Sequence, residues 1–441
     1  MSDQNVKFYP AKRLFTEILT QDIQLEPALL DLIDNSVDAY TRNDIKGKRK
    51  INIHISKEQV SITDTCGGIK REMLLDRVFR FGMQSVETDK QTIGYYGIGL
   101  KRALFKLGNN VLFSTDDGSN FSQLKLDVKE WLEDEKVWQI PLQEAGKSKL
   151  KNKENGYTQI EINNLNESIK ESFTTIFLNN FKNKLSRYYT FFIDDKIDFY
   201  LNDEIVEPYN LDVTFSKELK PIRVKENVNG LLVDITTWVE PRSEARETQI
   251  RGKRGFNIFM NNRLILANDI SENTGWGSQP SLLPIYHPLY NRFRGIVRIY
   301  TNDLSALPIN TVKTNFNFEH NNYHAIVELI TKYARPFIDY LSTIFSEEKE
   351  ELDKREEEIT SQQSDDVDKA NIVSQNINEV EENIKQPSQP LKKAKTTRIA
   401  FHKPKKKVDE LKKHFECTSN TKLGEYLFDY VRDAEGFSDD D

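Results

Sequence analysis

The chain has 441 residues, of which 37% are hydrophobic and 30% charged, and its formal net charge is −7. This length and composition predict a globular protein of two to three domains. No apolar run is long enough to span a bilayer, the N-terminus lacks the apolar core of a signal peptide, and two cysteines are too few for a disulfide framework. We therefore expect a protein without a membrane partner in a reducing compartment, which is the cytoplasm, or the nucleus if the organism is a eukaryote.

Hydrophobic periodicity and turn residues predict the elements of the first half of the chain. They are helices over 11–20 and 27–42, a hairpin over 51–64, helices over 70–80 and 100–107, strands from 111 through 162, a helix over 167–187 and two strands within 191–208. The strands predict a mixed sheet in a domain that closes near residue 210. Residues 211–345 read as further strands followed by a long helix, in which Pro336 predicts a kink or a break.

The last hundred residues differ sharply in composition. Residues 346–390 are acidic and predict a linker, residues 391–408 form a basic tract, and residues 409–441 predict short helices or disorder. The lysines and arginines within 392–407 are typical of non-specific contacts with DNA phosphates, but also of a solvated linker that pairs with the acidic run. The C-terminal tail is a candidate surface for a protein partner.

Residues 28–39 carry the most informative pattern of the chain. An apolar stripe alternates at helical spacing with oxygen-bearing side chains, which are Asp31, Asp34, Asn35 and Asp38. An oxygen-rich helix face suits Mg²⁺, whose coordination shell phosphates complete. The same pattern also fits an ordinary amphipathic surface helix.

Three later segments favour the nucleotide-binding interpretation. A β-branched strand ends at Asp64 and is followed by a glycine turn, ITDTCGGI over 62–69. Residues 93–101, IGYYGIGLK, place glycines before an apolar helix, and such a helix start favours an anion. An alternating strand over 156–162 carries Thr158. Each segment alone is common, whereas their order and spacing together are specific.

Together these segments resemble the nucleotide site of the GHKL superfamily, which includes gyrase B subunits, heat-shock chaperones, histidine kinases and MutL. The resemblance implies a Bergerat fold that holds ATP and Mg²⁺ between a helical layer and a mixed sheet. It implies Asn35 as the Mg²⁺ ligand and Asp64 as the acceptor for the adenine amino group, with Thr158 supporting Asp64. It also implies an ATP lid over 83–95. The remaining nucleotide-binding residues that it implies are Gly68, Ile69, Gly94, Gly97, Ile98, Gly99, Leu100 and Lys101.

Residues 255–265 and 293–316 resemble the transducer domain of MORC and MutL proteins, with MORC closer. The likeness, which covers roughly residues 8–345, implies that Lys313 reaches the γ-phosphate. Arg263, in the turn of the first segment, is expected to bond the turn's own carbonyls. The expected fold class is α+β: a two-layer α/β-sandwich ATPase domain over 1–210, a transducer-type α/β domain over 211–345, and a mostly disordered charged tail.

The chain departs from the family at its catalytic position. A glutamate usually lies four residues before the asparagine, and here that position is Asp31, one methylene shorter. A misplacement of about 1 Å can cost on the order of a hundredfold in rate, so slow turnover is expected. With Asp31 and Lys313 as catalytic residues, the leading hypothesis is an ATP-hydrolysing clamp that forms a homodimer on ATP binding and acts on DNA. The alternatives are a nucleotide-sensing module with little or no hydrolysis and a GHKL-type protein kinase.

Overall fold

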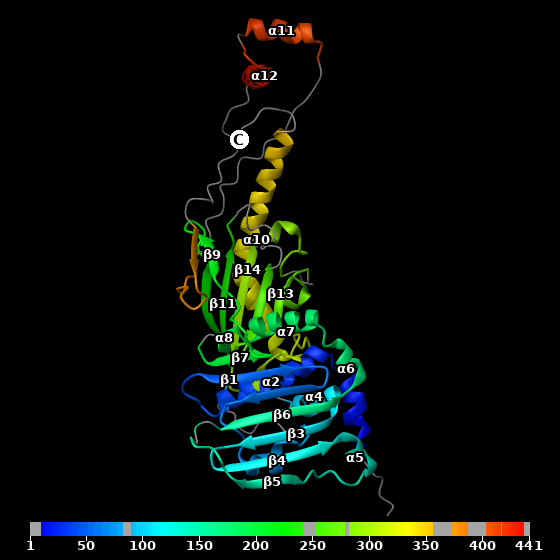
Figure 1. The fold of residues 1–441 in the computed structure, drawn as a ribbon. Coiled ribbons are helices and arrows are strands. Elements are labelled where there is room, and N and C mark those ends of the chain that lie inside the picture. Colours follow the sequence, from blue (N-terminus) through cyan, green and yellow to red (C-terminus); the bar gives the residue numbers. More distant parts are fainter. Residues whose placement is uncertain are drawn as a thin grey trace, which may run out of the picture. The chain divides into compact units, whose positions relative to one another are not determined.

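The computed structural model describes residues 10–82, 90–94, 96–152, 154, 156–193, 195–241, 253–277, 282–355, 372–386, 403–415 and 417–435. The chain divides into two compact units, Met1–Pro390 and Leu391–Asp441 (Figure 1). Within the described ranges, no helix combines the length and the apolar character that crossing a bilayer requires.

The first part of the larger unit is built on an eight-stranded sheet. Its spatial order is β5-β4-β3-β6-β2-β1-β7-β8. Every neighbouring pair is antiparallel except β1 and β7, which are parallel, so the sheet is mixed as expected. The strands are β1 (Arg49–Ile55), β2 (Gln59–Asp64), β3 (Gly108–Asp116), β4 (Asn120–Asp127), β5 (Leu142–Lys147), β6 (Tyr157–Leu165), β7 (Ile197–Leu201) and β8 (Glu204–Ile205).

The helices of this part are α1 (Leu19–Gln21), α2 (Leu25–Arg42), α3 (Arg71–Met73), α4 (Gly99–Leu107), α5 (Val128–Glu133), α6 (Glu167–Ser172), α7 (Thr175–Tyr188) and α8 (Thr190–Ile193). Of these, α2 and α4 lie against one face of the sheet and form the second layer (Figure 1). Short π-helical turns over Leu14–Ile18 and Leu74–Val78 adjoin α1 and α3. The helix expected over 167–187 is therefore two helices, which are separated at Phe173.

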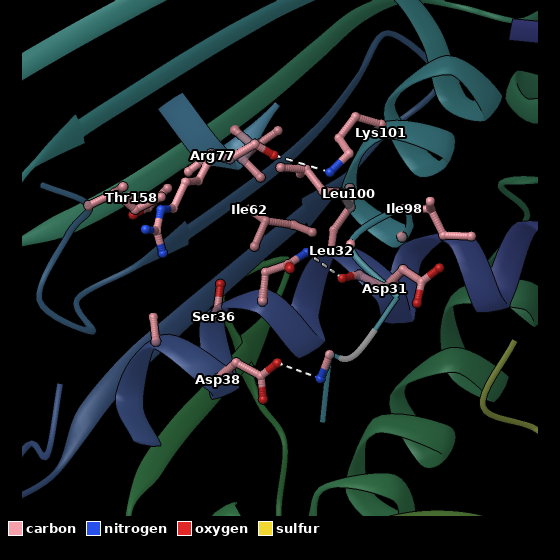
Figure 2. Close-up of a pocket in the computed structure, with 18 of the residues that line it drawn as sticks. Asp31, Leu32, Ser36, Asp38, Ile62, Arg77, Ile98, Leu100, Lys101 and Thr158 are labelled. Atoms are coloured by element: carbon pink, nitrogen blue, oxygen red, sulfur yellow. Dashed lines mark hydrogen bonds between the residues drawn. The ribbon is translucent and has the colours of Figure 1, made fainter. Parts of the chain in front are cut away.

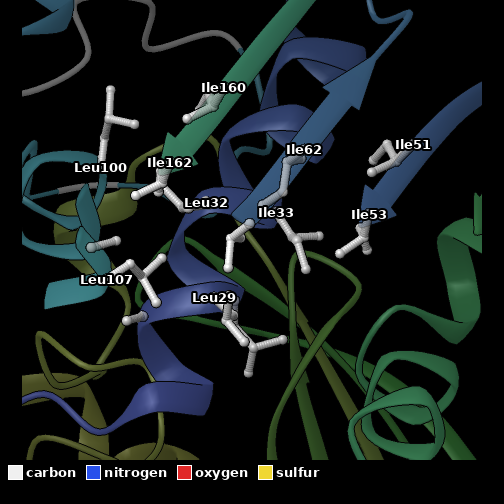
Figure 3. Packing of buried hydrophobic residues seen from close by; sticks show 14 of the residues in the cluster. Leu29, Leu32, Ile33, Ile51, Ile53, Ile62, Leu100, Leu107, Ile160 and Ile162 are labelled. Atoms are coloured by element: carbon white, nitrogen blue, oxygen red, sulfur yellow. The ribbon is translucent and has the colours of Figure 1, made fainter. Parts of the chain in front are cut away.

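Helix α2 is the central element of this layer. Its start tolerates Pro27 because the amide groups of a first helical turn have no intrahelical acceptor. The apolar stripe of α2, represented by Leu29, Leu32 and Ile33, packs against isoleucines of β1, β2 and β6 (Figure 3). All three leucine and isoleucine side chains are at most 1% exposed. This packing fixes the rotation of α2, so its oxygen-bearing residues lie at a defined position beside the sheet.

The second part of the larger unit holds a five-stranded sheet in the order β10-β11-β14-β12-β13. Pairs are antiparallel except β12 with β14. The strands are β10 (Ile222–Val228), β11 (Leu231–Val239), β12 (Gly255–Met260), β13 (Arg263–Asp269) and β14 (Phe293–Tyr300). Asn261 and Asn262 join β12 to β13 with φ of 45° and 67°, as a tight hairpin turn requires.

Helix α10 (Asn321–Arg355) packs on this second sheet and is continuous through Pro336. The break that Pro336 predicts does not occur. Proline removes one intrahelical hydrogen bond and crowds the preceding turn. Its neighbours Ala334, Phe337 and Ile338 are nearly fully buried in the second core, and this burial offsets the local cost.

Residues 372–386 are ordered although they lie within the acidic stretch that predicts a linker. Strand β15 (Ile372–Gln375) pairs antiparallel with β9 (Val213–Ser216), and the two strands form a separate two-stranded sheet. Ile377 and Val380 then bury against the second part of the unit at 1% and 4% exposure. We call residues 372–386 the strap.

The smaller unit contains α11 (Lys405–His414) and α12 (Asn420–Ala434). The rings of Phe415 and Tyr426 meet with centroids 4.7 Å apart, and Leu423 is buried. The expectation for residues 409–441 was short helices or disorder, and these two helices lie in or next to that range. The α+β architecture, with large mixed sheets and a second α/β part, is confirmed.

Candidate nucleotide-binding site

A cavity opens between α2, the ends of β2 and β6, the glycine-rich turn before α4, and the loop that carries Thr311 and Lys313 (Figure 2). Of the residues that the sequence predicts for the site, all but Gly68 line it. They are Asp31, Asn35, Asp64, Ile69, Gly94, Gly97, Ile98, Gly99, Leu100, Lys101, Thr158 and Lys313. Segments up to about 280 residues apart in sequence thus converge on one cavity, as Lys313 and Asp31 show.

Gly68 has a different place. Its φ is +67°, and a Cβ there would lie 2.1 Å from the backbone oxygen of Asp116 on β3. Only glycine fits such a left-handed position in close backbone contact. Gly68 therefore shapes the turn after β2, while its neighbour Ile69 lines the cavity.

Asp64, at the end of β2, lines the cavity and is 3% exposed. Its Oδ2 accepts a hydrogen bond from Ser36 Oγ on α2 at 2.8 Å, and its Oδ1 accepts from the backbone nitrogen of Cys66 at 2.9 Å. Burial raises the pKa of Asp64 to about 6, although these donors act in the opposite direction. The carboxylate is held in one orientation, and its remaining lone pairs can accept from a ligand donor.

Thr158 is paired with Asp64 across β6 and β2. Its hydroxyl lies 3.3 Å from Thr115 Oγ1, which in turn accepts from the backbone nitrogen of Ile69 at 2.8 Å. This hydroxyl chain connects the strand position of Thr158 to the turn after Asp64. The cavity walls around this polar end are apolar and aromatic, which suits a flat heterocyclic base: Ile62, Ile69, Met73, Val78, Phe113 and Ile160.

Asn35 faces the cavity from the middle of α2. Its Nδ2 donates to the carbonyl oxygen of Asp31 at 2.6 Å. Because the amide nitrogen is engaged by the helix, the amide oxygen is the atom with capacity for a metal. Within the described ranges, no three His, Cys, Asp or Glu side chains cluster so that they could hold a metal ion. An amide oxygen is one of the ligand types that Mg²⁺ accepts beside phosphates and water.

The glycine-rich turn forms the opposite wall. Gly97 has φ of +61°, and a Cβ on Gly99 would lie 2.9 Å from Asp31 Cγ, so a larger residue would collide with the carboxylate. Helix α4 begins at Gly99, and its N-terminal amides suit phosphate oxygens. Lys101 in its first turn is 5% exposed, and its Nζ donates to the carbonyl of Val78 at 3.2 Å (Figure 2). Burial lowers the pKa of Lys101 to about 8.

The predicted lid lies largely outside the described residues, which include only 90–94 of it. Asp38 on α2 accepts from the backbone nitrogens of Ile93 at 2.6 Å and Gly94 at 2.8 Å. Asn261 donates to the carbonyl of Thr92 at 2.8 Å. Directly after the lid, the hydroxyl of Tyr96 donates to the carbonyl of Ile309 at 2.9 Å. The described end of this segment is therefore bonded both to α2 and to the second part of the unit.

Two carboxylates of α2 form a buried network with cations from other elements beside the cavity, and we call it the cavity network. Lys313 Nζ lies 2.7 Å from Asp34 Oδ2 and 3.1 Å from Asp31 Oδ1. Arg263 Nε lies 2.9 Å from Asp34 Oδ1. Arg102 Nη2 lies 2.7 Å from Asp31 Oδ2. Two carboxylates of the helix are thus balanced by one lysine and two arginines.

Opposite charges set the protonation of this network. Burial alone raises the pKa of Asp34, but the charges of Arg263 and Lys313 outweigh it and hold that pKa below its usual value. Burial lowers the pKa of Lys313, and Asp34 and Asp31 outweigh it and raise that pKa. Both residues are therefore ionised near neutral pH. Lys313 also has φ of +56°, an uncommon backbone conformation for lysine that often marks a functional position.

The expectation for Arg263 is wrong in its main point. Its Nη1 does donate to the neighbouring carbonyl of Leu264, but its other bonds go to Asp34 of α2 and to the carbonyl of Lys313. Arg263 thus joins the hairpin turn to the first part of the unit. Sequence reasoning also missed Arg102 and Thr311 in the site, because their roles depend on tertiary placement rather than on a motif.

Residues 23–158 match the family model described as histidine kinase-, DNA gyrase B-, and HSP90-like ATPase. The matched segment runs from just before α2 to Thr158, so it includes every predicted nucleotide-binding residue of the first sheet and its helices. This part of the chain is therefore similar to GHKL-type ATPase domains. A comparison of the chain with curated proteins found no match.

Proposed function

We propose that the protein is a Mg²⁺-dependent ATPase that works as a conformational clamp. The observation that carries this proposal is the convergence of Asn35, Asp64 and Lys313 on one cavity of a GHKL-type domain. In this arrangement the adenine amino group donates to Asp64, and the triphosphate extends along α2 toward Asp31. Mg²⁺, bound through the oxygen of Asn35, neutralises charge on the phosphates.

The inner end of the cavity supplies the hydrolytic groups. Asp31 contacts Gly99 at the start of α4, so its carboxylate lies beside the amides that suit the phosphates. There it accepts a proton from the attacking water. Lys313 exchanges its bond with Asp31 for the γ-phosphate and stabilises the charge that develops on it.

Clamp motion follows from the same contacts. Three bonds join the first and second parts of the unit here. Lys313 pairs with Asp31 of α2, and Asn261 donates to Thr92 at the described end of the lid. Tyr96, directly after the lid, donates to Ile309. A γ-phosphate that draws Lys313 changes this set of bonds, and such contacts are a common basis of nucleotide switches. We propose a clamp of the MORC and MutL type, in which ATP binding orders the lid and joins two copies of the chain.

Phosphate release at saturating ATP tests the hydrolytic part. We expect slow turnover in the wild type, none above background in Asp31→Ala, and unchanged turnover in Asp22→Ala, a substitution at an exposed position just before α2. Binding of a non-hydrolysable ATP analogue should survive in Asp31→Ala. Turnover that persists in Asp31→Ala would remove Asp31 from the mechanism.

One observation favours a second function, a nucleotide sensor with little or no hydrolysis. Both carboxylate oxygens of Asp31 are engaged by cations, Oδ2 by Arg102 and Oδ1 by Lys313. With both oxygens occupied by donors, the carboxylate can face an attacking water through Oδ1 only if Lys313 moves. Phosphate release separates the two functions, because a sensor binds the analogue tightly and releases no phosphate in the wild type.

Dimerisation and DNA contact are the remaining parts of the proposal. Most of the basic tract over 392–407 lies outside the described residues, but α11 continues it with Lys405, Lys406, Lys407, Lys412 and Lys413. Light scattering should show a doubled mass with the analogue. Duplex binding should weaken steeply with salt and with alanine at Lys405, Lys406 and Lys407. An unchanged mass, or duplex binding that ignores the lysines, contradicts the respective part.

A further inference from the structure

Arg102 is a buried arginine that no nucleotide-binding motif in this chain includes. It lies in the first turn of α4, directly after Lys101, and is 6% exposed. Its Nε and Nη2 donate to the same oxygen of Asp31, Oδ2, at 2.9 and 2.7 Å. Its Nη2 also donates to the backbone carbonyl of Thr311 at 3.0 Å. The guanidinium therefore joins α2, α4 and the loop before Lys313.

These bonds fix one half of the Asp31 carboxylate. Oδ2 is held by Arg102, whereas Oδ1 accepts from Lys313 at a longer distance of 3.1 Å. The two oxygens of one carboxylate are thus engaged by two different cations. If Lys313 turns toward a γ-phosphate, Oδ1 becomes available while Oδ2 stays bonded.

We propose that Arg102 is the positioning residue that holds the Asp31 carboxylate for hydrolysis. The inference rests on the proposed ATPase function. Aspartate is a methylene shorter than glutamate, so its carboxylate depends more on an external anchor to stay beside the phosphates. A buried carboxylate also needs a partner charge, and Arg102 supplies it after Lys313 has left.

The reaction balances with this assignment. Water attacks the γ-phosphorus, and its proton passes to Asp31 Oδ1. The bond between the γ-phosphorus and the β–γ bridging oxygen breaks, and ADP leaves with that electron pair. Asp31 then returns the proton to solvent. Arg102 contacts neither water nor phosphate in this sequence and acts only through Asp31.

The test compares Arg102→Met and Arg102→Lys with Lys106→Met. Lys106 is on the same helix and outside the cavity lining, and its Nζ donates to the carbonyl of Thr20. For each variant we would measure kcat, KM and the dissociation constant of a non-hydrolysable ATP analogue. Thermal unfolding would identify the variants that are folded.

We expect Arg102→Met to lower kcat on the order of a hundredfold and to keep the analogue's dissociation constant within about threefold. KM should stay close to the wild-type value, because Arg102 lies outside the cavity lining. Arg102→Lys should retain more of kcat than Arg102→Met. An ammonium restores the positive charge but not the two hydrogen bonds that the guanidinium donates to Oδ2. Lys106→Met should behave as the wild type.

Normal kcat in folded Arg102→Met would overturn the inference, and so would a parallel loss of kcat and analogue binding. If Arg102→Met does not fold, Arg102→Lys decides, because wild-type kcat in a folded Lys variant excludes the positioning role. A wild type that binds the analogue but releases no phosphate rejects the proposed hydrolysis itself. That result is distinguishable, because it appears before any variant is compared.

Discussion

Among the described residues of the larger unit, two buried groups of oppositely charged side chains differ in what surrounds them. The cavity network of α2 consists of Asp31, Asp34, Arg102, Arg263 and Lys313. The second group, which we call the sheet network, consists of Asp234 on β11 with Arg223 and Arg298. Arg223 Nη2 lies 3.0 Å from Asp234 Oδ2, and Arg298 Nη2 lies 2.5 Å from the same oxygen.

The sheet network is closed by the strap. Arg223 Nη1 donates to the carbonyls of Ile377, Asn378 and Val380, and Arg298 donates to Asn378 Oδ1 at 2.8 Å. These bonds use the donors of the two arginines within the protein. The cavity network instead borders a cavity, which Asp31 and Lys313 line. The contrast teaches that buried ion pairs mark a site only where part of the network faces a space that a ligand can fill.

The largest expected effect comes from breaking the sheet network. Asp234→Ala should lower the free energy of unfolding by about 3–5 kcal/mol, because it leaves two buried arginines without their counter-charge. Denaturant unfolding measures this loss, with Asp212→Ala at an exposed position as the control. The fraction of Asp234→Ala that is folded should bind the ATP analogue with the same affinity as the wild type. A loss of affinity in that fraction would show that the two networks are coupled.

The next effect concerns the pH dependence of nucleotide binding. The pKa of Asp64 is raised by burial from 3.8 to about 6, so the carboxylate becomes protonated as pH falls through 6. A donor such as the adenine amino group favours the ionised form, and ATP affinity should therefore drop about tenfold between pH 7 and pH 5. Calorimetric titration at several pH values measures it.

Two comparisons sharpen this prediction. A purine riboside triphosphate without the amino group shares the phosphate titration of ATP but lacks the donor, so its affinity should change less. Without nucleotide, the raised pKa of Asp64 should make the folded state less stable as pH rises from about 4 to 6, because the buried group becomes charged. Equal pH dependence of both ligands would refute the role of Asp64.

The smallest effect concerns the bond between Tyr96, which directly follows the lid, and Ile309 in the second part of the unit. Tyr96→Phe removes the hydroxyl that donates to Ile309 and should reduce stability by about 1 kcal/mol. If this bond carries clamp motion, ATP-dependent dimerisation should weaken while affinity for the analogue in the monomer stays the same. Tyr40→Phe, which removes a longer contact with Gly47, is the matched control. Identical dimerisation in both variants would limit the bond to a structural role.

Much of the site could be predicted from the sequence because its motifs are local. Asn35, Asp64 and Gly99 each belong to a short segment, and the order and spacing of these segments carry the resemblance from which their roles were predicted. Lys313 was predictable only through the resemblance of its surrounding segment, since a single lysine carries no signal. Arg102 was not predictable, because its role arises from the approach of α4 to α2.

The fold shows the same division. The mixed sheet, α2 and α4 follow from periodicity, and the structure confirms them. The strap was hidden because its acidic composition resembles a linker, and its apolar anchors Ile377 and Val380 are too few to form a pattern. The continuity of α10 through Pro336 was likewise hidden, because burial of neighbouring residues outweighs the local preference of proline.

Equilibrium binding of ATP to the wild type and to Asp64→Asn tests the central claim most directly. Both oxygens of Asp64 accept hydrogen bonds, from Ser36 and from the backbone of Cys66, so an amide must turn its NH₂ group toward one of these donors. The account predicts micromolar-range binding by the wild type with Mg²⁺, on the scale of about −8 kcal/mol, and no measurable binding by Asp64→Asn. Unchanged ATP affinity in a folded Asp64→Asn variant would contradict it.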